Sequence, residues 1–412
     1  MSLAFRLLES ALAGQVLTGR LIVTGADGEH FEVGDGTGAV VAIRFTDRRA
    51  PWALIVDPDL RLGELFTDGR LVVDEGEAFD LLTLILRHGD EARTSPLAAT
   101  LERVRARLIG WAQRNGLTGA RDNAVHHYDL GDDFYALFLD PDWQYSCAFF
   151  ERPGQSLAQA QAAKKRRIAA KLALEPGQSV VEIGCGWGGL ALTLVEEAGV
   201  EVDAITLSVE QLKVAQARAE AKGLAHKARF SLTDYRDLKG TYDRVLSVAM
   251  FEAVGRPHFQ EYFDGVARLM KDDGVGLIHA IGRPEPAVTN AWIDKYIFPG
   301  GYSPALSEVM PAIERAGLIV TDVEILRLHY AETIRHWREG FEKVRPEIAE
   351  LYDERFCRMF EFYLGIAKQS FRARRQFIWQ IQVAKRVDVL PITRDYIGET
   401  ERAMAKPRKQ VA

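Results

Sequence analysis

Cysteine is scarce in this chain of 412 residues, which contains only Cys147, Cys185 and Cys357. Their number is odd and they lie far apart, so they suggest neither a disulfide framework nor a zinc site. We therefore expect a protein of a reducing compartment that holds no metal.

The chain also lacks an apolar run of the ~18 to 20 residues that a membrane-spanning helix needs. The first twenty residues look like a signal peptide, but Glu9 and Ser10 interrupt the apolar stretch. The leucines there recur at the spacing of an amphipathic helix, predicted at about 2–14. These features predict a soluble, cytoplasmic protein.

Excess charge of either sign is small, since the formal net charge is −6. Residues 1–95 carry 9 Lys and Arg against 16 Asp and Glu, whereas the remainder is nearly balanced at +1. Nothing in this balance favours a nucleic-acid partner. The basic residues of the remainder cluster at 164–167, at 372–375 and at 385–386. Such clusters can hold a protein on anionic lipid, at about 1 kcal/mol per charge, but we interpret each one as a solvated helix face.

The pattern of the first 122 residues predicts two parts without a catalytic motif. Residues 1–92 combine short alternating segments, such as 39–45, with flanking helices, which predicts a small α+β domain. Residues 93–122 open with Thr-Ser-Pro and predict a linker helix. Its face is basic and amphipathic, and we expect it to pack on protein rather than on lipid.

From about residue 176, apolar strand segments alternate with helical ones. The predicted strands are 179–184, 202–207, 228–232, 244–250, 274–282, 318–326 and 377–385. This alternation predicts an α/β fold with an open, largely parallel sheet and a site at the carboxyl ends of its strands. Two insertions, 283–317 and 327–376, could fold over that site. The tail after Arg386 is expected to be a loose end.

The strongest motif is the glycine-rich sequence VVEIGCGWGGL at 180–190. Its glycines follow a predicted strand and precede a helix, so that the backbone can bend tightly and approach a ligand. The spacing fits both a dinucleotide motif and the Gly-x-Gly-x-Gly of methyltransferases. Glu182, two residues before the first glycine, is typical of methyltransferases, and the next strand ends Thr206-Leu207-Ser208 without the acid that holds a dinucleotide ribose. The motif therefore favours S-adenosylmethionine over NAD.

Segments from 124 to 386 resemble the cyclopropane fatty acid synthases, which include the mycolic acid cyclopropane synthases. The likeness is carried by HHYDLGDDFYALFLD (126–140), YSCAFF (145–150), ITLSVEQ (205–211), DYRD (234–237), SVAMFEAVG (247–255), LIHAIG (277–282) and HYAETIRHW (329–337), besides the glycine motif. The resemblance implies a seven-stranded, Rossmann-like class I methyltransferase sheet in a catalytic domain at 123–386, with 387–412 as a C-terminal tail. It also implies that 1–92 is the smaller domain of longer bacterial members, related to lipid or dimer contacts. A homodimer at the inner membrane surface is the implied assembly, and unsaturated phospholipids are the implied partners.

The same resemblance implies which residues form the site. The implied cofactor-binding residues are Tyr145, Ser146, Glu182, Gly184, Gly186, Gly188, Thr206, Leu207, Gln211, Asp234 and Tyr235. The family also binds bicarbonate beside the reacting methyl group, and the matching positions are Cys147, Glu252, His279, Ile281 and Tyr330. Near Glu252 the match is looser, because Ala249 and Ala253 stand where relatives often carry Glu or Gly, and His. The pair His126-His127 is not read as a metal site, because adjacent side chains diverge.

Methylation of an alkene explains why such residues are needed. The double bond attacks the S-methyl group directly and leaves positive charge on carbon, so water must be excluded. Aromatic rings can stabilise the cation, and the candidates are Tyr145, Trp187, Tyr235, Phe251 and Tyr302. A base must then remove a proton from the transferred methyl group before the ring closes, and a bicarbonate oriented by Glu252 can take that role.

Each residue taken alone also has a simpler explanation. His279 could be a core histidine, Cys147 could fill space, and Glu252 could cap the helix that begins near Pro257. Other functions remain open as well: methylation of a small amine on the same fold, a methyl- or methylene-branched lipid product, or a lipid-binding protein whose site has decayed. The complete set of five bicarbonate-site residues argues against the last.

Overall fold

The computed structural model describes residues 1–87 and 131–405, which fall into two units. Of these residues, the first unit comprises 1–87, 287–299 and 334–376, and the second comprises 131–286, 300–333 and 377–405. The predicted linker helix at 93–122 and the pair His126-His127 lie outside the described residues, and the domain boundaries drawn from the sequence stay a prediction.

Seven strands of the second unit form one sheet, as the alternating sequence pattern predicts. They are β5 (Ser179–Ile183), β6 (Glu201–Thr206), β7 (Ala228–Leu232), β8 (Tyr242–Val248), β9 (Met270–Gly282), β10 (Ile319–Ile325) and β11 (Phe377–Ala384). Their order is β10-β11-β9-β8-β5-β6-β7. β11 runs antiparallel to both neighbours and the remaining pairs are parallel. The expected α/β class with a seven-stranded, Rossmann-like methyltransferase sheet is confirmed.

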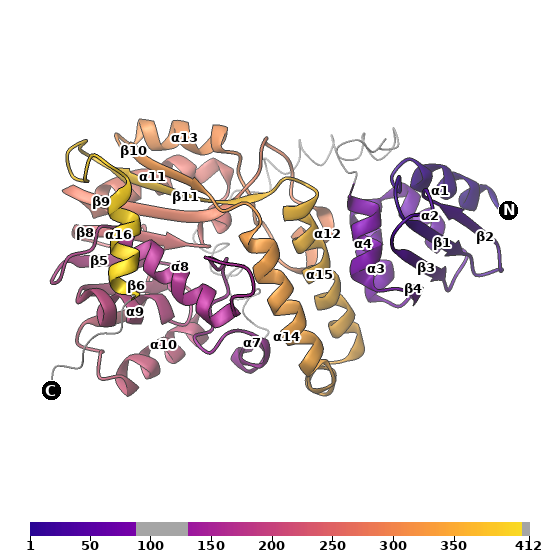
Figure 1. The fold of residues 1–412 in the computed structure, drawn as a ribbon, viewed down its shortest axis with the longest axis horizontal. Coiled ribbons are helices and arrows are strands. Elements are labelled where there is room, and N and C mark those ends of the chain that lie inside the picture. Colours follow the sequence, from indigo (N-terminus) through magenta and orange to yellow (C-terminus); the bar gives the residue numbers. More distant parts are fainter. Residues whose placement is uncertain (88–130, 406–412) are drawn as a thin grey trace. The chain divides into compact units, whose positions relative to one another are not determined.

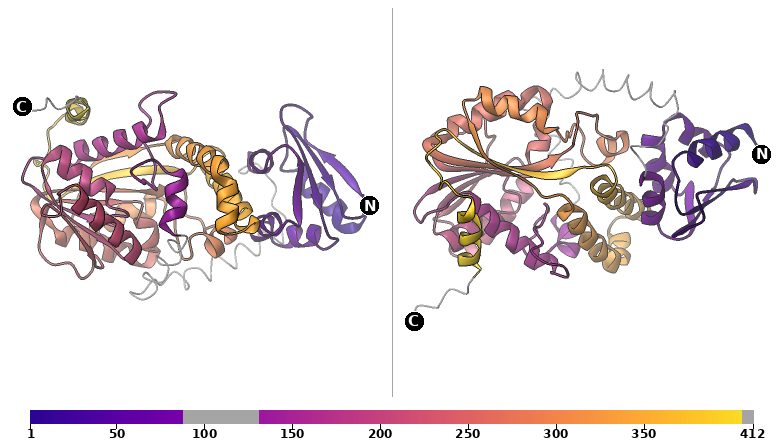
Figure 2. Two further views of the ribbon diagram at one scale, coloured as in Figure 1. Left: turned by 90° about the horizontal axis from the view of Figure 1, so that it is seen from below. Right: turned by 45° about the horizontal axis from the view of Figure 1, so that its top comes forward.

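Helices cover both faces of this sheet (Figures 1 and 2). One face carries α11 (Phe259–Leu269) and α13 (Leu306–Arg315), whose side chains Tyr262 and Val309 belong to one buried cluster. The other face carries α8 (Leu157–Lys171), α9 (Gly189–Ala198) and α10 (Val209–Ala221), with Ile168 and Ala215 in a second cluster. The short elements of this unit are α7 (Asp132–Phe138) and the 3-10 helices η1 (Phe251–Ala253) and η2 (Arg256–His258). Each face of the sheet is therefore covered by a buried core. Residues that bind a ligand are expected at the ends of the strands.

The C-terminal segment is folded against the sheet, and the expectation of a loose end after Arg386 was wrong. Residues Asp395–Met404 form helix α16, which packs along α8. Its Ile397 is 2% exposed, and Glu401 accepts a hydrogen bond from Arg167 on α8 at 2.8 Å. The sequence here is mostly polar, so its amphipathic face becomes apparent only beside its partner helix.

The ion pairs that surround Arg167 should make stability fall in acid. Glu324 on β10 contacts Arg167 and lies 2.8 Å from Lys171. Burial alone would raise the pKa of Glu324, but these two cations lower it from 4.5 to about 2. Because the folded pKa lies below the unfolded one, the carboxylate stabilises the fold above about pH 4.5 and loses this effect as the pH falls toward 2.

The expected contribution of Glu324 to the free energy of unfolding at pH 7 is on the order of 3 kcal/mol. Urea unfolding should therefore show Glu324→Gln to be less stable than the parent at pH 7, with the difference shrinking as the pH is lowered to 3. The exposed Glu399→Gln on α16 serves as the control and should follow the parent at both pH values. A difference between Glu324→Gln and the parent that does not change with pH would contradict the prediction.

The N-terminal part of the first unit is a four-stranded sheet with four helices. Its elements are α1 (Leu3–Ala13), β1 (Arg20–Thr24), β2 (His30–Val33), β3 (Val40–Phe45), α2 (Ala50–Val56), α3 (Pro58–Thr67), β4 (Leu71–Glu75) and α4 (Ala78–Leu86). The sheet order is β2-β1-β3-β4. As the alternation at 39–45 predicts, Val41, Ile43 and Phe45 are all buried.

Three helices from later in the chain complete the first unit. They are α12 (Ala291–Tyr296), α14 (His329–Leu351), which begins in the second unit, and α15 (Glu354–Arg372). α15 packs on α3 and α4, and α12 packs on α3. An added Cβ at Gly63 would lie 2.5 Å from the Trp292 ring, so only glycine allows this approach of α3 to α12. Among the helices described at 1–87 and 131–405, none is both long and apolar enough to cross a bilayer.

Candidate active site

The glycine loop joins β5 to α9 at the carboxyl edge of the sheet. Its backbone is tied to the neighbouring strand, because the N–H groups of Gly184 and Cys185 donate to the Ile205 carbonyl at 3.0 and 2.9 Å. Gly186 has φ +54°, and an added Cβ there would meet no atom of the described residues within 4 Å. An added Cβ at Gly188 (φ +80°) would lie 2.8 Å from the Phe230 ring. Gly188 is therefore needed for packing, whereas the Gly186 backbone faces space that a ligand can use.

Glu182 lies under this loop on β5 and is 2% exposed. Its carboxylate accepts a backbone hydrogen bond from Ala191, in the first turn of α9, where helical N–H groups lack intrahelical partners. Its Oε2 atom is buried and has no partner. Burial raises the pKa of Glu182 to about 8, against the opposing charge of Lys164. Glu182 thus anchors the loop and retains one oxygen for another donor.

A side-chain amide from the first turn of α10 is held by the end of β6. The Thr206 hydroxyl donates to Gln211 Oε1 at 3.0 Å and accepts from the Ser208 N–H at 3.1 Å. This orients the buried Gln211, whose Nε2 donor has no partner. Leu207, half-buried, follows Thr206 directly. An amide donor held in this way suits a hydroxyl-bearing ligand such as a ribose.

Asp234 and Tyr235 follow β7, the next strand along the sheet. Asp234 pairs with Arg236 at 2.7 Å, and this contact lowers the pKa of Asp234 although burial opposes it. Tyr235 is 9% exposed, and its ring meets that of Tyr262 edge-on at 5.3 Å. Tyr235 therefore belongs largely to the core, and Asp234 has the more polar surroundings of the two.

The segment 145–150 lies beside the start of α14, about 180 residues later in the chain. The Ala148 N–H donates to the Thr333 hydroxyl and the Phe150 N–H to His329 Nδ1, both at 3.0 Å. These contacts bring Cys147 and Tyr330 into one region. Cys147 is 1% exposed, and burial raises the pKa of its thiol far above the ordinary value. The thiol is therefore neutral and is not a nucleophile.

Glu252 lies on η1, directly after β8. Its Oε1 accepts the Ile281 N–H at 2.6 Å, which fixes the carboxylate to the end of β9, while its Oε2 is buried without a partner. Burial raises the pKa of Glu252 to about 7. The alternative role as a helix cap was wrong, because the residue that precedes α11 is His258.

His279 lies two residues before Ile281 on β9, so both side chains leave the same face of the strand. Its Nδ1 lies 3.1 Å from the side-chain nitrogen of Gln380 on β11. An amide nitrogen only donates, so Nδ1 accepts and the ring proton belongs on Nε2, which has no partner. Burial and the charges of Lys164 and Lys171 lower the pKa of His279 to about 3. The ring is therefore a neutral hydrogen-bond donor at physiological pH.

Two pairs of buried polar atoms without partners thus mark two neighbouring subsites. Glu182 Oε2 and Gln211 Nε2, beside the Gly186 backbone, fit a nucleoside that carries an amino-acid group. Glu252 Oε2 and His279 Nε2 provide one acceptor and one donor, which fit a small oxyanion that bears a hydrogen. Glu182 and His279 lie near the ends of β5 and β9, Gln211 lies in the first turn of α10 after β6, and Glu252 lies on η1 after β8.

The aromatic residues expected to stabilise a cation are mostly engaged elsewhere. Tyr235, Phe251 and Tyr302 belong to the cluster under α11 and α13. Trp187 is 4% exposed and donates to Asp132 at 2.6 Å. Tyr145 is only half-buried, with its ring 4.9 Å from that of Tyr135, and it does not belong to that cluster.

The first basic cluster is buried, and its interpretation as a solvated helix face was wrong. Lys164 is 0% exposed and Lys165 9% exposed. Lys165 pairs with Asp142 at 2.5 Å, while Arg167 pairs with Glu324 and Glu401. Lys164 donates to the side chains of Gln144 and Ser146. The sequence of a basic cluster does not show whether carboxylates from distant segments will pair with it.

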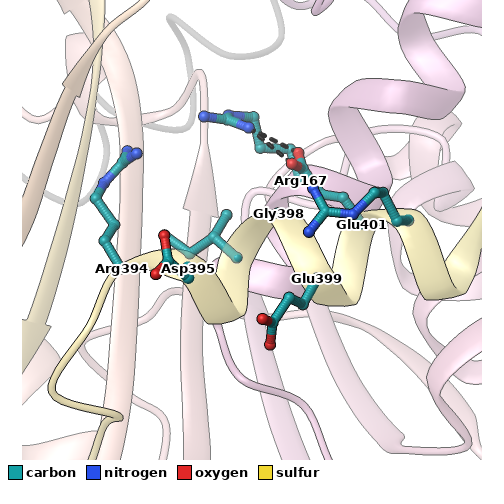
Figure 3. A pocket seen from close by; sticks show the side chains of 8 residues that line it. Arg167, Arg394, Asp395, Gly398, Glu399 and Glu401 are labelled. Carbon is teal, nitrogen blue, oxygen red and sulfur yellow. Dashed lines mark hydrogen bonds and ion pairs between the residues drawn. The ribbon is translucent and has the colours of Figure 1, made fainter.

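A separate pocket of about 460 Å³ lies where α16 meets α8 (Figure 3). Arg167, Arg394 and Arg402 line it together with Asp395, Glu399 and Glu401. The charges of both signs largely balance, and Arg167 is engaged by Glu401. This pocket contains none of the predicted site residues.

Comparisons with known proteins agree on one family. Residues 116–381 match the family model described as mycolic acid cyclopropane synthetase. The cyclopropane-fatty-acyl-phospholipid synthase of Escherichia coli strain K12 is 37% identical over 339 residues, covering 81% of this chain and 85% of that protein. The tuberculostearic acid methyltransferase UfaA1 of Mycobacterium tuberculosis is 40% identical over 62% of each chain.

Solved structures give the same result. The mycolic acid cyclopropane synthase CmaA1, complexed with S-adenosylhomocysteine (SAH) and CTAB, is 31% identical and superposes with a TM-score of 0.61. The match covers 64% of this chain and 97% of that one.

Proposed function

Because the chain belongs to the mycolic acid cyclopropane synthetase family, we propose that this S-adenosylmethionine-dependent methyltransferase methylates the cis double bond of unsaturated phospholipid acyl chains. The product closes to a cyclopropane ring. The observation that carries this proposal is the pair of buried atoms without partners, Glu252 Oε2 and His279 Nε2, beside a glycine loop of methyltransferase type.

The cofactor subsite is proposed to hold S-adenosylmethionine, which supplies an electrophilic methyl group. Gln211 Nε2 donates to a ribose hydroxyl, and Glu182 Oε2 accepts from the amino group of the methionine part. The Gly186 backbone lies against the ligand, and Tyr145 and Ser146 contact its amino-acid end. The remaining implied contacts are Gly184, Gly188, Thr206, Leu207, Asp234 and Tyr235.

The second subsite is proposed to hold bicarbonate, which supplies a base for the proton that leaves before ring closure. His279 Nε2–H donates to the anion and Glu252 Oε2 accepts its hydroxyl hydrogen, which increases the basicity of the anion. Cys147, Ile281 and Tyr330 complete the implied set. His279 is not the base itself, because its Nδ1 accepts from Gln380 and its Nε2 already bears the proton.

We also propose, from the family resemblance, that the protein is a cytoplasmic homodimer associated with the inner membrane surface. The N-terminal domain is the part proposed to serve lipid or dimer contacts. Association with the membrane gives the active site access to the acyl chains that the proposed reaction requires.

Expression in a bacterial host that lacks the activity tests the proposed reaction. Unsaturated phospholipid chains are expected to become about 14 mass units heavier, because one CH2 is added. Gas chromatography with mass spectrometry of the fatty esters separates the cyclopropane from branched isomers. Unchanged lipids, together with methylation of a small amine, would overturn the assignment.

A methyl- or methylene-branched product is the second candidate. It is supported by the 40% identity with a tuberculostearic acid methyltransferase. The same cation gives a methylene-branched chain when a hydride shift precedes proton loss from the transferred methyl group. A methyl branch requires a separate hydride donor that reduces this product. The chromatogram of the fatty esters decides between the two products.

A further inference from the structure

Lys164 on α8 is a cation buried completely within the second unit. It is 0% exposed, and its Nζ donates to Gln144 Oε1 at 2.6 Å and to Ser146 Oγ at 2.8 Å. Among the described residues, no carboxylate lies within the 4.0 Å of an ion pair with it. Lys165 and Lys171 on the same helix both have such partners. Asp140 and Asp142 act on Lys164 through their charge, but neither forms an ion pair with it. A buried ammonium without a direct ion pair is costly, so its retention indicates a function.

The contact with Lys164 decides which way the Ser146 hydroxyl points. An ammonium group only donates, so Ser146 Oγ is the acceptor and its own hydrogen is directed elsewhere. None of the described residues accepts that hydrogen. Ser146, which is 7% exposed, therefore presents an O–H donor that lies beside a positive charge.

The segment that contains Ser146 is held on both sides. Gln161, one turn before Lys164, donates to the backbone carbonyls of Gln144 and Ser146 at 3.2 and 2.9 Å. On the other side, an added Cβ at Gly189 would lie 2.5 Å from Gln144 Nε2, so the segment packs directly on the first residue of α9. The Ser146 hydroxyl is thus fixed relative to the glycine loop, because that loop ends at Gly189.

The local charge balance is positive. Asp140 and Asp142 are the carboxyls whose charge acts on Lys164. Asp142 is already paired with two other cations, Lys165 and Arg218, and burial raises the pKa of Asp140. Burial lowers the pKa of Lys164, but only to about 8, so the ammonium keeps its charge at neutral pH. The site therefore favours an anionic group on its ligand.

We propose that Lys164 is a positioning residue for the carboxylate of the methionine part of S-adenosylmethionine, acting through the Ser146 hydroxyl. This inference rests on the proposed function, in which Ser146 contacts the amino-acid end of the cofactor. Lys164 turns the hydroxyl toward the carboxylate and supplies the compensating charge beneath it.

Two ligands separate this role from a purely structural one. SAH carries the amino-acid group, whereas 5′-methylthioadenosine lacks it. Calorimetric titration of Lys164→Met is expected to show at least about tenfold weaker binding of SAH and less than a twofold change for methylthioadenosine. The KM for S-adenosylmethionine should rise more than kcat falls.

Lys171→Met is the matched control, because Lys171 is equally buried on the same helix but faces Asp322 and Glu324. It should alter neither affinity. Ser146→Ala should reproduce the selective loss, and the double variant should lose little more than Lys164→Met alone, since the two residues act through one hydrogen bond. Ser146→Ala also keeps the test decisive should Lys164→Met fail to fold.

Equal weakening of both ligands, or unchanged SAH binding, would overturn the role of Lys164. A parent protein that binds neither nucleoside would overturn this inference together with the proposed cofactor subsite. Selective loss in the variants combined with unchanged lipids in the host would support the inference and reject only the lipid substrate.

Discussion

Glu252→Gln is expected to lower kcat by about a thousandfold while SAH binding stays within twofold of the parent. Glutamine can still accept the Ile281 N–H through its oxygen. The second position, however, changes from a carboxylate oxygen to an amide donor, so it no longer accepts the hydrogen of a bound bicarbonate. The side chain keeps its shape, and the expected loss is therefore one of chemistry and not of folding.

The measurement is single-turnover methylation of phospholipid vesicles at saturating S-adenosylmethionine, with calorimetric titration of SAH in parallel. Glu261→Gln on α11 is the control, because Glu261 is exposed and its contact is with His258, away from the two subsites. It should behave as the parent. Normal turnover in Glu252→Gln would remove the bicarbonate mechanism, although the fold and the cofactor subsite would still stand.

Gly186→Ala is expected to weaken SAH binding by at least about a hundredfold in a protein that still folds. The added methyl group meets no atom of the described residues, but it enters the space beside the loop into which the ligand is proposed to fit. The residue also has φ +54°, where an alanine costs about 1 kcal/mol relative to glycine. Most of the damage should therefore fall on ligand binding.

Gly223→Ala separates backbone strain from lost binding. Gly223 follows α10 with φ +68°, and an added Cβ there also has no neighbour within 4 Å. Both variants should lose a similar free energy of unfolding in urea, but only Gly186→Ala should lose affinity for SAH. Equal SAH affinity in the two variants would show that the Gly186 backbone does not border the cofactor.

Features with a local cause could be predicted from the sequence. The seven strands follow from apolar segments of strand length between helical ones, and the loop at 184–188 follows from glycines whose positive φ values the structure confirms at Gly184, Gly186 and Gly188. The two-sided burial of β5 agrees with its apolar residues Val180, Val181 and Ile183, which point to both faces of the sheet. These signals need only a few neighbouring residues.

Features that depend on partners distant in the chain could not be predicted. Gln380 orients His279 from 101 residues away, and Thr333 holds Ala148 from 185 residues away. Neither has a motif of its own. The burial of Lys164 and the docking of α16 were missed for the same reason, because a charged or polar stretch does not reveal which surface it will meet. Phe251, which precedes Glu252 in the sequence, was predicted as a candidate to stabilise a cation, but its side chain belongs to the hydrophobic core.

The position of β11 in the sheet has a consequence for biosynthesis. This strand pairs with β9 on one side and β10 on the other, yet it follows both in the chain, after the whole of α14 and α15. During translation β9 and β10 are synthesised before β11. The edges of β9 and β10 that pair with β11 therefore have no β11 partner for their hydrogen bonds until residue 384 has left the ribosome. Gln380 is part of the same strand, so the His279 ring is ordered by this contact only after β11 has been synthesised and has paired with β9.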